Sequence, residues 1–294
     1  MESPTAKPRY GRWCVIVAAI LWSTSGFFAK APWFEDWPIA TRGIQLAFWR
    51  ALFATLVALP FVRRVRWSWK LAPMAVTFLL MNIAYLNAMT RTTAANAIWL
   101  QNTAPFWVFL IGVFVFHEPL HKRDAVRLCL AGIGVGLILL FELGGNSPEG
   151  TLLGLASGLT YAGVVLALRR LRDFDAAFLI AFNHAVTAVA LLPLVIWFGV
   201  QPKGIQWPAL AGFGMLQMGI PYVLFAFSLK SITSHEASGL TLLEPILVPV
   251  WVFLAWHTHS NYQSPKWWTL VGGAFILAGL VVRYFGANDN CSDE

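Results

Sequence analysis

Charged residues are scarce in this chain, and their scarcity excludes a water-soluble globule. Only 12% of the 294 residues are charged, whereas 58% are hydrophobic. The mean hydropathy is +0.64. So few polar side chains cannot cover the surface of a soluble protein of this size. We therefore expect the chain to fold in a lipid bilayer.

The residue patterns of metal sites, disulfides and common catalytic centres are also missing. The three cysteines, Cys14, Cys129 and Cys291, are isolated and odd in number, which favours neither a disulfide framework nor a metal site. His235-Glu236 lacks the second histidine of a zinc-protease motif, and the chain has no Gly-x-Ser-x-Gly and no phosphate-binding loop. We expect no enzymatic activity, no metal and no cofactor.

Apolar stretches long enough to cross a bilayer fill the chain. A spanning helix needs roughly 20 mainly apolar residues. Such stretches lie near residues 12–30, 40–62, 71–90, 95–116, 124–142, 151–168, 176–198, 207–229, 236–257 and 267–285. The first is too long for a signal peptide and is expected to be retained. The predicted fold is an all-α integral membrane protein with ten transmembrane helices.

Basic residues alternate between the connections, which predicts the orientation. One set of connections carries Lys7, Arg9, Arg12, Arg63, Arg64, Arg66, Lys70, Lys122, Arg123, Arg127, Arg169, Arg170, Arg172, Lys230 and Arg283. The other set carries only Lys30, Arg42, Arg91, Lys203 and Lys266. Because cytoplasmic loops are enriched in Lys and Arg, we expect both termini in the cytoplasm and the protein in the cytoplasmic (inner) membrane. Topology also explains the net charge of +7, so no nucleic-acid partner is expected.

The two halves of the chain repeat each other. A shift of 140 residues pairs Pro105 with Pro245, and a shift of 134 pairs Arg50 with His184. The linker at residues 144–148 divides a first repeat, residues 1–145, from a second, residues 146–294, which together form one membrane domain. Five spans per repeat is an odd number, so the second repeat must be inverted, as in many secondary transporters.

The chain resembles the drug/metabolite transporter superfamily, in its ten-helix EamA-type branch. The resemblance rests on Leu100 to Pro105 and Leu240 to Pro245, on Glu118, on Arg50, and on the Gly-rich segments 132–140 and 272–282. His257-Thr258-His259 stands where a second glutamate like Glu118 would be expected. With its aromatic content of 15%, the chain looks most like the YddG-type aromatic amino-acid exporters. The resemblance implies a central cavity lined by spans one, three, four, six, eight and nine.

Glu244 is the sharpest candidate for a functional residue. A carboxylate in mid-span costs roughly 2.5–3.5 kcal/mol on insertion scales and is retained mostly where it faces a cavity. It is interpreted as a ligand for a substrate ammonium group or as a proton-coupling site. The alternative is a protonated glutamate that hydrogen-bonds to a neighbouring helix.

Two prolines are candidate hinges. Pro105 and Pro245 each remove one helical hydrogen bond, which should leave the carbonyls of Gln101 and Thr241 without their usual donors and kink the helices. Their symmetric placement favours pivots of the two halves over simple packing.

Other intramembrane polar and aromatic residues are predicted to hold the helices or to bind substrate. Arg50 and His184 are expected to be structural, because a charged arginine at mid-span must find carbonyls, a carboxylate or water. For any single aromatic residue, lipid contact or packing is an equal alternative to a substrate contact. The predicted substrate-binding set is Trp22, Asn82, Tyr85, Trp99, Gln101, Asn102, Tyr161, Tyr222, Thr241 and Glu244. Two small-residue motifs, Gly132-x3-Gly136 and Gly154-x3-Gly158, predict close helix packing.

These patterns predict a secondary transporter that exports amino acids, aromatic and other neutral ones, by alternating access. The expected partners are small amino-acid substrates and the lipid bilayer. A permease for another metabolite or drug is the alternative within transport, and a membrane scaffold or passive channel is the alternative outside it. The sequence leaves open the coupling ion, the transport direction and the oligomeric state.

Overall fold

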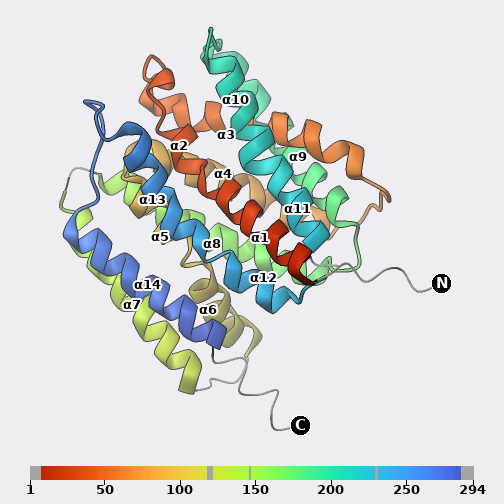
Figure 1. Cartoon of the computed structure of the whole chain (residues 1–294), viewed down its shortest axis with the longest axis vertical. Helices are drawn as coiled ribbons and strands as arrows, with labels where there is room; N and C mark the ends of the chain where they lie inside the picture. Colours follow the sequence, from red (N-terminus) through yellow and green to blue (C-terminus); the bar gives the residue numbers. More distant parts are fainter. Residues whose placement is uncertain (1–7, 118–121, 146, 229–230, 286–294) are drawn as a thin grey trace.

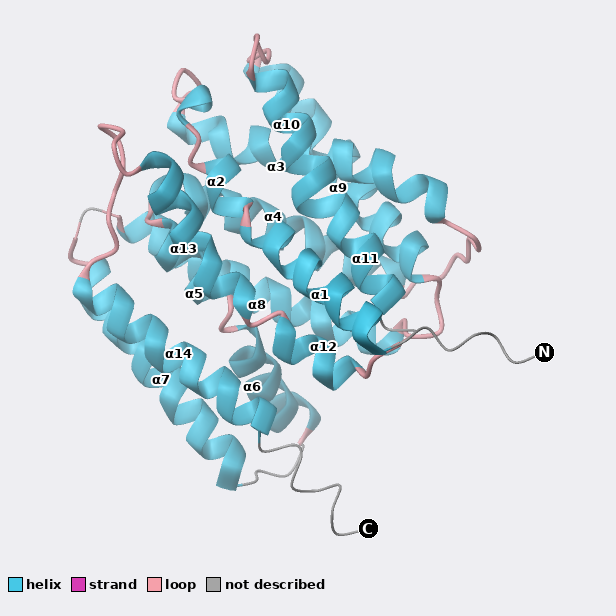
Figure 2. Ribbon diagram, in the orientation of Figure 1, coloured by secondary structure: helices cyan, strands magenta, loops and turns pink. Residues whose placement is uncertain are grey.

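The computed structural model describes residues 8–117, 122–145, 147–228 and 231–285. Every regular element within these residues is helical, and Figure 2 draws no strand among them. In chain order the elements are α1 (Pro8–Ser23), α2 (Ser25–Ala29), η1 (Pro32–Phe34), α3 (Ile39–Ala58), η2 (Leu59–Phe61), α4 (Leu71–Arg91), α5 (Ala94–Gln101), α6 (Ala104–Phe116), α7 (Lys122–Glu142), α8 (Pro148–Arg170), α9 (Ala176–Phe198), α10 (Gln206–Gly214), the π-helical η3 (Met215–Gly219), α11 (Ile220–Ser228), α12 (Ser234–Leu240), α13 (Leu243–Trp256) and α14 (Trp267–Phe285). Lys7, Glu118, Lys230 and Cys291 lie outside the described residues.

Within the described residues, seven single or joined helices are long and apolar enough to span a membrane. They are Arg9–Ala29, Ile39–Phe61, Leu71–Arg91, Ala94–Phe116, Pro148–Arg170, Ala176–Phe198 and Gln206–Ser228. The expected fifth, ninth and tenth spans instead contain shorter apolar helices, Leu128–Glu142, Leu243–Trp256 and Trp267–Val281. The structure thus has many apolar helices, and ten full spans stay a prediction.

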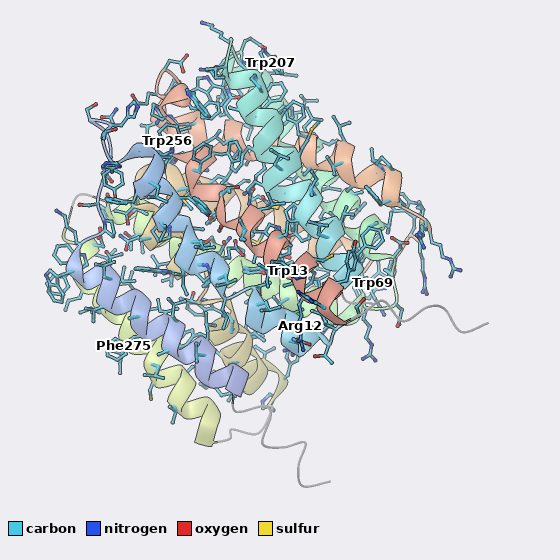
Figure 3. The ribbon with its side chains drawn as sticks, in the orientation of Figure 1. Arg12, Trp13, Trp69, Trp207, Trp256 and Phe275 are labelled. Carbon is cyan, nitrogen blue, oxygen red and sulfur yellow. The ribbon has the colours of Figure 1, made fainter. Side chains whose placement is uncertain are left out.

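The helices run side by side, and their connections gather at two opposite ends of the bundle. In Figure 1 the α2–α3, α9–α10 and α13–α14 connections lie toward the upper left, whereas the α3–α4 and α8–α9 connections lie toward the right. Figure 3 shows Trp207 and Trp256 in the upper part of the picture, Trp13 near its centre and Trp69 to the right of Trp13. All four indole side chains are at helix ends or in connections, as expected of residues at a membrane interface.

The two halves of the chain pack against each other along their whole length. Helix α4 packs on α8, α7 on α14, α3 on α9 and α1 on α11. The backbones of α7 and α14 meet at Gly134 and Gly272, where a Cβ built on Gly134 would lie 2.4 Å from the carbonyl oxygen of Gly272. Small residues permit such contact between membrane helices. The largest buried cluster accordingly contains residues of both halves.

Candidate functional site

Two helices are broken in the same way, 140 residues apart. The α5–α6 and α12–α13 pairs each begin at a threonine N-cap: Thr93 accepts from the backbone N–H of Asn96 at 3.1 Å, and Thr233 accepts from that of Glu236 at 3.2 Å. Satisfying an otherwise unpaired N–H at a helix start in this way is the usual role of a threonine cap. Both short helices end within eight residues. The matched sequence positions therefore adopt matched local structures.

Each proline stands in the first turn of the second helix of its pair, so the helix restarts there. Pro105 is the second residue of α6, and Pro245 is the third residue of α13. Proline is tolerated in a first turn because its missing N–H has no intrahelical partner there. The expected kink is therefore a full break. The carbonyl of Thr241, whose usual donor would be residue 245, accepts instead the N–H of Glu244 at 3.0 Å. The hinge role of Pro105 and Pro245 stays a prediction.

The second break places Glu244 in the first turn of α13. Its side chain is partly exposed, and a carboxylate is favoured by the positive end of a helix dipole. Next to it, the carbonyl of Pro245 accepts a hydrogen bond from the indole Nε1 of Trp99, at 2.9 Å. This bond joins α5 of the first half to α13 of the second. Trp99 itself is only 6% exposed.

Arg50 lies in the middle of α3 and is 1% exposed. Its Nη2 donates to the Oδ1 of Asn82, whose own Nδ2 donates to the carbonyl of Phe78 at 2.8 Å. The second bond fixes the amide so that its oxygen faces the guanidinium group. The guanidinium carbon lies 5.9 Å from the ring centre of Tyr85 and 5.2 Å from that of Phe213, both within cation–π range.

Further aromatic rings in this region come from four helices, α1, α4, α9 and α11. The hydroxyl of Tyr85 shares a hydrogen bond of 2.8 Å with Ser25 of α2. Tyr222 of α11 lies with its ring centre 5.2 Å from Trp22 and 6.0 Å from His184. His184 is fully buried, and within the described part of the chain neither of its ring nitrogens has a hydrogen-bond partner.

Part of the predicted binding set lies within electrostatic range of Glu244. The carboxyl group of Glu244 interacts electrostatically with Arg50 and with the phenol groups of Tyr85, Tyr161 and Tyr222. These residues come from α3, α4, α8, α11 and α13, and therefore from both halves. Among the described residues no ion pair within 4.0 Å joins Glu244 to Arg50.

The remaining predicted residues have contacts of other kinds. Trp22 accepts through its backbone carbonyl from Nε2 of Gln217, at 3.1 Å. The amide of Asn102 donates back to the carbonyl of Ile98 at 2.9 Å, and Gln101 and Thr241 are partly exposed at the ends of α5 and α12. The substrate-binding roles of all these residues stay predictions.

Two buried amides and one aromatic ring were missed by sequence reasoning. Gln217 lies in the π-helical turn, and Gln45 of α3 is fully buried with both polar side-chain atoms unpartnered within the described residues. The rule that singled out Asn82, a polar residue inside an apolar span, would also have found these glutamines. Nothing in the sequence could have singled out Phe213 as a neighbour of Arg50, because phenylalanine is common in apolar helices.

The comparisons with known proteins identify the family. A family model described as the EamA-like transporter family matches two segments, residues 9–140 and 148–285. The chain belongs to this family. An "Uncharacterized transporter" of Archaeoglobus fulgidus is 29% identical and aligns over 94% of this chain and 97% of its own length. An "Uncharacterized transporter YxxF" of Bacillus subtilis is 24% identical, over 91% of this chain and 87% of its own.

A solved crystal structure has the same overall fold. It matches with a TM-score of 0.64 and 19% sequence identity, over 97% of this EamA-like chain and 99% of its own. The relatives and the family are named as transporters, which favours transport over catalysis. None of these names carries a substrate, so membership of the YddG-type branch is not shown. Within the described residues no group of His, Cys, Asp and Glu could hold a metal ion.

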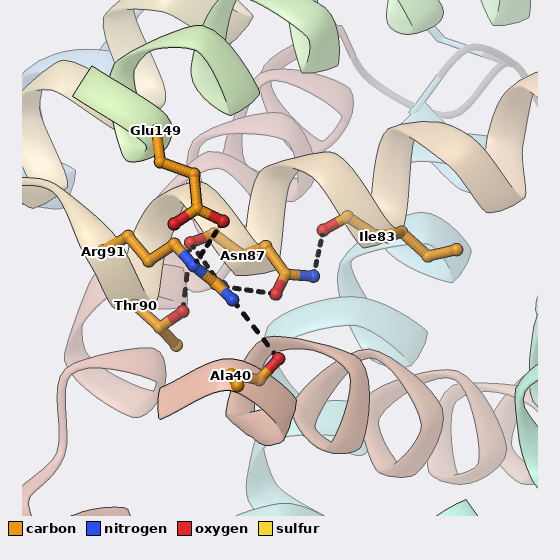
Figure 4. Close-up of polar contacts among 6 residues, drawn as sticks. All are labelled: Ala40, Ile83, Asn87, Thr90, Arg91 and Glu149. Carbon is orange, nitrogen blue, oxygen red and sulfur yellow. Dashed lines mark hydrogen bonds and ion pairs between the residues drawn. The ribbon is translucent and has the colours of Figure 1, made fainter. Parts of the chain in front are cut away.

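A second polar cluster joins the two halves of the EamA-like chain near the end of α4 (Figure 4). Arg91 donates to Oδ1 of Asn87 at 2.5 Å and to the carbonyl of Ala40 at 3.2 Å, and its Nε lies 3.1 Å from Glu149 of α8. Glu149 is 71% exposed, and such exposed ion pairs contribute little stability. This arginine therefore has a full set of partners and serves to join helices.

Proposed function

We propose that this protein is a secondary transporter that exports amino acids, aromatic and other neutral ones, across the cytoplasmic membrane by alternating access. Membership of the EamA-like transporter family supports transport. The repeated helix breaks and the two matches of the family model support two inverted five-helix repeats, residues 1–145 and 146–294. An inverted pair can exchange conformations and so open alternately to the two sides.

One observation carries the substrate class. Glu244 is a carboxyl group inside an apolar bundle, at a helix break, and no described cation lies within ion-pair distance of it. An intramembrane ionisable residue is a functional-site hypothesis by default. An ammonium group is the chemistry that it recognises, and Tyr85, Tyr161 and Tyr222 supply rings for an aromatic side chain.

The predicted effect of Glu244→Gln is loss of transport in a protein that still folds. Glutamine keeps the volume and the hydrogen-bonding capacity of glutamate but removes the ionisable group. Uptake of labelled phenylalanine into preloaded proteoliposomes should fall at least about tenfold, because the loss of one charge-assisted hydrogen bond corresponds to about that factor. Arg91→Gln, which changes a charge at the second polar cluster, is the matched control and should keep its uptake.

The same vesicles distinguish the alternatives. Competition by unlabelled amino acids, sugars and nucleotides shows which class shares the site. If sugars or nucleotides compete and amino acids do not, the protein is a permease for another metabolite. Wild-type uptake by Glu244→Gln at every pH would show that this carboxylate is structural.

A further inference from the structure

Arg50 is the most deeply buried arginine described, yet most of its donors have no protein partner. A guanidinium group has five N–H donors, and only Nη2 is hydrogen-bonded, to the neutral amide of Asn82. Nε is fully enclosed without a partner within the described residues. Nη1 has no hydrogen bond there either, and it is not among the fully enclosed atoms. Nε and Nη1 therefore keep a hydrogen-bonding capacity that no described protein group uses.

Two other arginines of the same chain show what a structural arginine has here. Arg42 donates from Nε and Nη2 to the carbonyl of Trp37, at 3.1 and 2.7 Å, and to that of Glu35 at 3.0 Å. The three side-chain nitrogens of Arg91 contact the amide oxygen of Asn87, the carbonyl of Ala40 and the carboxylate of Glu149. Both are more exposed than Arg50. If Arg50 were purely structural, it would be the most buried of these three arginines and would have the fewest hydrogen-bond partners.

The charge of Arg50 is not neutralised by contact with an acid. Arginine stays protonated in proteins, and a buried charge without a partner is strongly destabilising. The acidic residue that interacts with it is Glu244, but these two do not form an ion pair within 4.0 Å. The guanidinium group on α3 and the carboxyl group on α13 thus interact across the two repeats without forming an ion pair.

We propose that Arg50 binds the carboxylate of the transported amino acid. The inference rests on the proposed function, in which Glu244 binds the ammonium group of the substrate. It adds that Arg50 binds the carboxylate of the same substrate. A zwitterion would then satisfy both separated charges at once. Carboxylates accept two parallel bonds from a guanidinium fork, and the rings of Tyr85 and Phe213 lie 5.9 and 5.2 Å from the guanidinium carbon. This assignment replaces the structural role expected for Arg50 from sequence.

The test compares three ligands that differ in one charged group. L-phenylalanine, L-phenylalaninamide, which lacks the carboxylate, and 3-phenylpropionate, which lacks the ammonium, compete with labelled phenylalanine in preloaded proteoliposomes. For the wild-type protein the amide should need at least about a tenfold higher concentration than phenylalanine, because a charge-assisted pair is lost. In Arg50→Gln the two concentrations should agree within about threefold. Arg91→Gln should keep the wild-type ratio.

Binding can be measured where transport is lost. If Arg50→Gln folds but does not transport, the same ratio is read from ligand-induced thermal stabilisation in detergent. If it does not fold, Arg50→Lys is used, which keeps the charge but not the fork and should reduce the ratio without abolishing it. A wild-type ratio in a folded Arg50→Gln protein would overturn the proposal, and so would equal competition by phenylalanine and its amide in the wild type. In both cases the wild-type protein still takes up phenylalanine, whereas absence of phenylalanine uptake in the wild type would contradict the proposed function itself.

Discussion

At the scale of single residues, the sequence was informative about which polar groups are buried and uninformative about their partners. Arg50 and His184 were singled out because polar groups inside apolar spans are costly, and both are fully buried. Their contacts could not be predicted, since they depend on which helices meet. The bond from Arg50 to Asn82 and the bond from Tyr85 to Ser25 join residues 32 and 60 positions apart.

Trp99 and Tyr161, both predicted to bind substrate, have different surroundings, and their substitutions should differ in effect. Tyr161 is 38% exposed in the middle of α8, so Tyr161→Ala should weaken competition by phenylalanine more than competition by threonine, by up to about tenfold. Trp99 packs on Gly273, where a built Cβ would lie 2.1 Å from the indole ring. Trp99→Ala should therefore lower stability, by about 3–5 kcal/mol.

Two measurements separate these effects. Competition assays in proteoliposomes report selectivity, and thermal unfolding in detergent reports stability. An equal loss of phenylalanine and threonine competition in Tyr161→Ala would mean that this ring does not select the substrate. An unfolding temperature for Trp99→Ala equal to that of the wild type would contradict the packing role of the indole.

At the scale of elements, the prolines predicted where two helices are interrupted but not how. Pro105 and Pro245 suggested kinks, whereas the chain breaks before each proline and restarts a helix. A proline inside an apolar run does not reveal whether the preceding residues stay helical. The structure also explains why the first break is stable: Thr103 Oγ1 donates to the carbonyl of Leu100 at 2.6 Å, and α8 covers the break with Gly158.

Gly158→Ala tests this contact between α8 and the first break. An alanine Cβ would lie 2.4 Å from Oγ1 of Thr103 and 2.5 Å from the carbonyl oxygen of Leu100. Because a backbone carbonyl cannot move aside easily, the substitution should cost about 1–3 kcal/mol. Thermal unfolding of the detergent-solubilised protein measures this loss.

Gly136 provides the matched control. It belongs to the other Gly-x3-Gly motif, but a Cβ built there meets nothing within 4 Å among the described residues. Alanine is the better helix former by up to about 1 kcal/mol, so Gly136→Ala should be neutral or stabilising. Equal unfolding temperatures for the two variants would contradict the assigned packing of α8 on the α5–α6 break.

At the scale of the whole molecule, hydropathy predicted the class of the fold better than its assembly. The all-helical membrane architecture follows from composition, and the family was predicted from the repeated proline motif. Which helices pair could not be read from hydropathy, because lipid-facing and buried positions are equally apolar. The pairing of α4 with α8 and of α7 with α14 connects the two halves throughout the bundle.

The orientation in the membrane is a separate prediction. Because the basic connections alternate through an even number of expected spans, both termini should be cytoplasmic. Alkaline phosphatase and a fluorescent protein, each fused to the C-terminus, report opposite sides of the membrane. A fluorescent and phosphatase-negative C-terminus is expected, and high phosphatase activity would contradict the even number of crossings.

The central claim is that the two halves alternate around one amino-acid site, and counterflow tests it most directly. Vesicles containing the purified protein are preloaded with unlabelled phenylalanine and diluted into a trace of labelled phenylalanine. A carrier with one alternating site exchanges the two, so the label should accumulate transiently above its equilibrium level, and saturably so. Label that enters only to equilibrium, at a rate proportional to its concentration and independent of preloading, would contradict alternating access and indicate a passive channel.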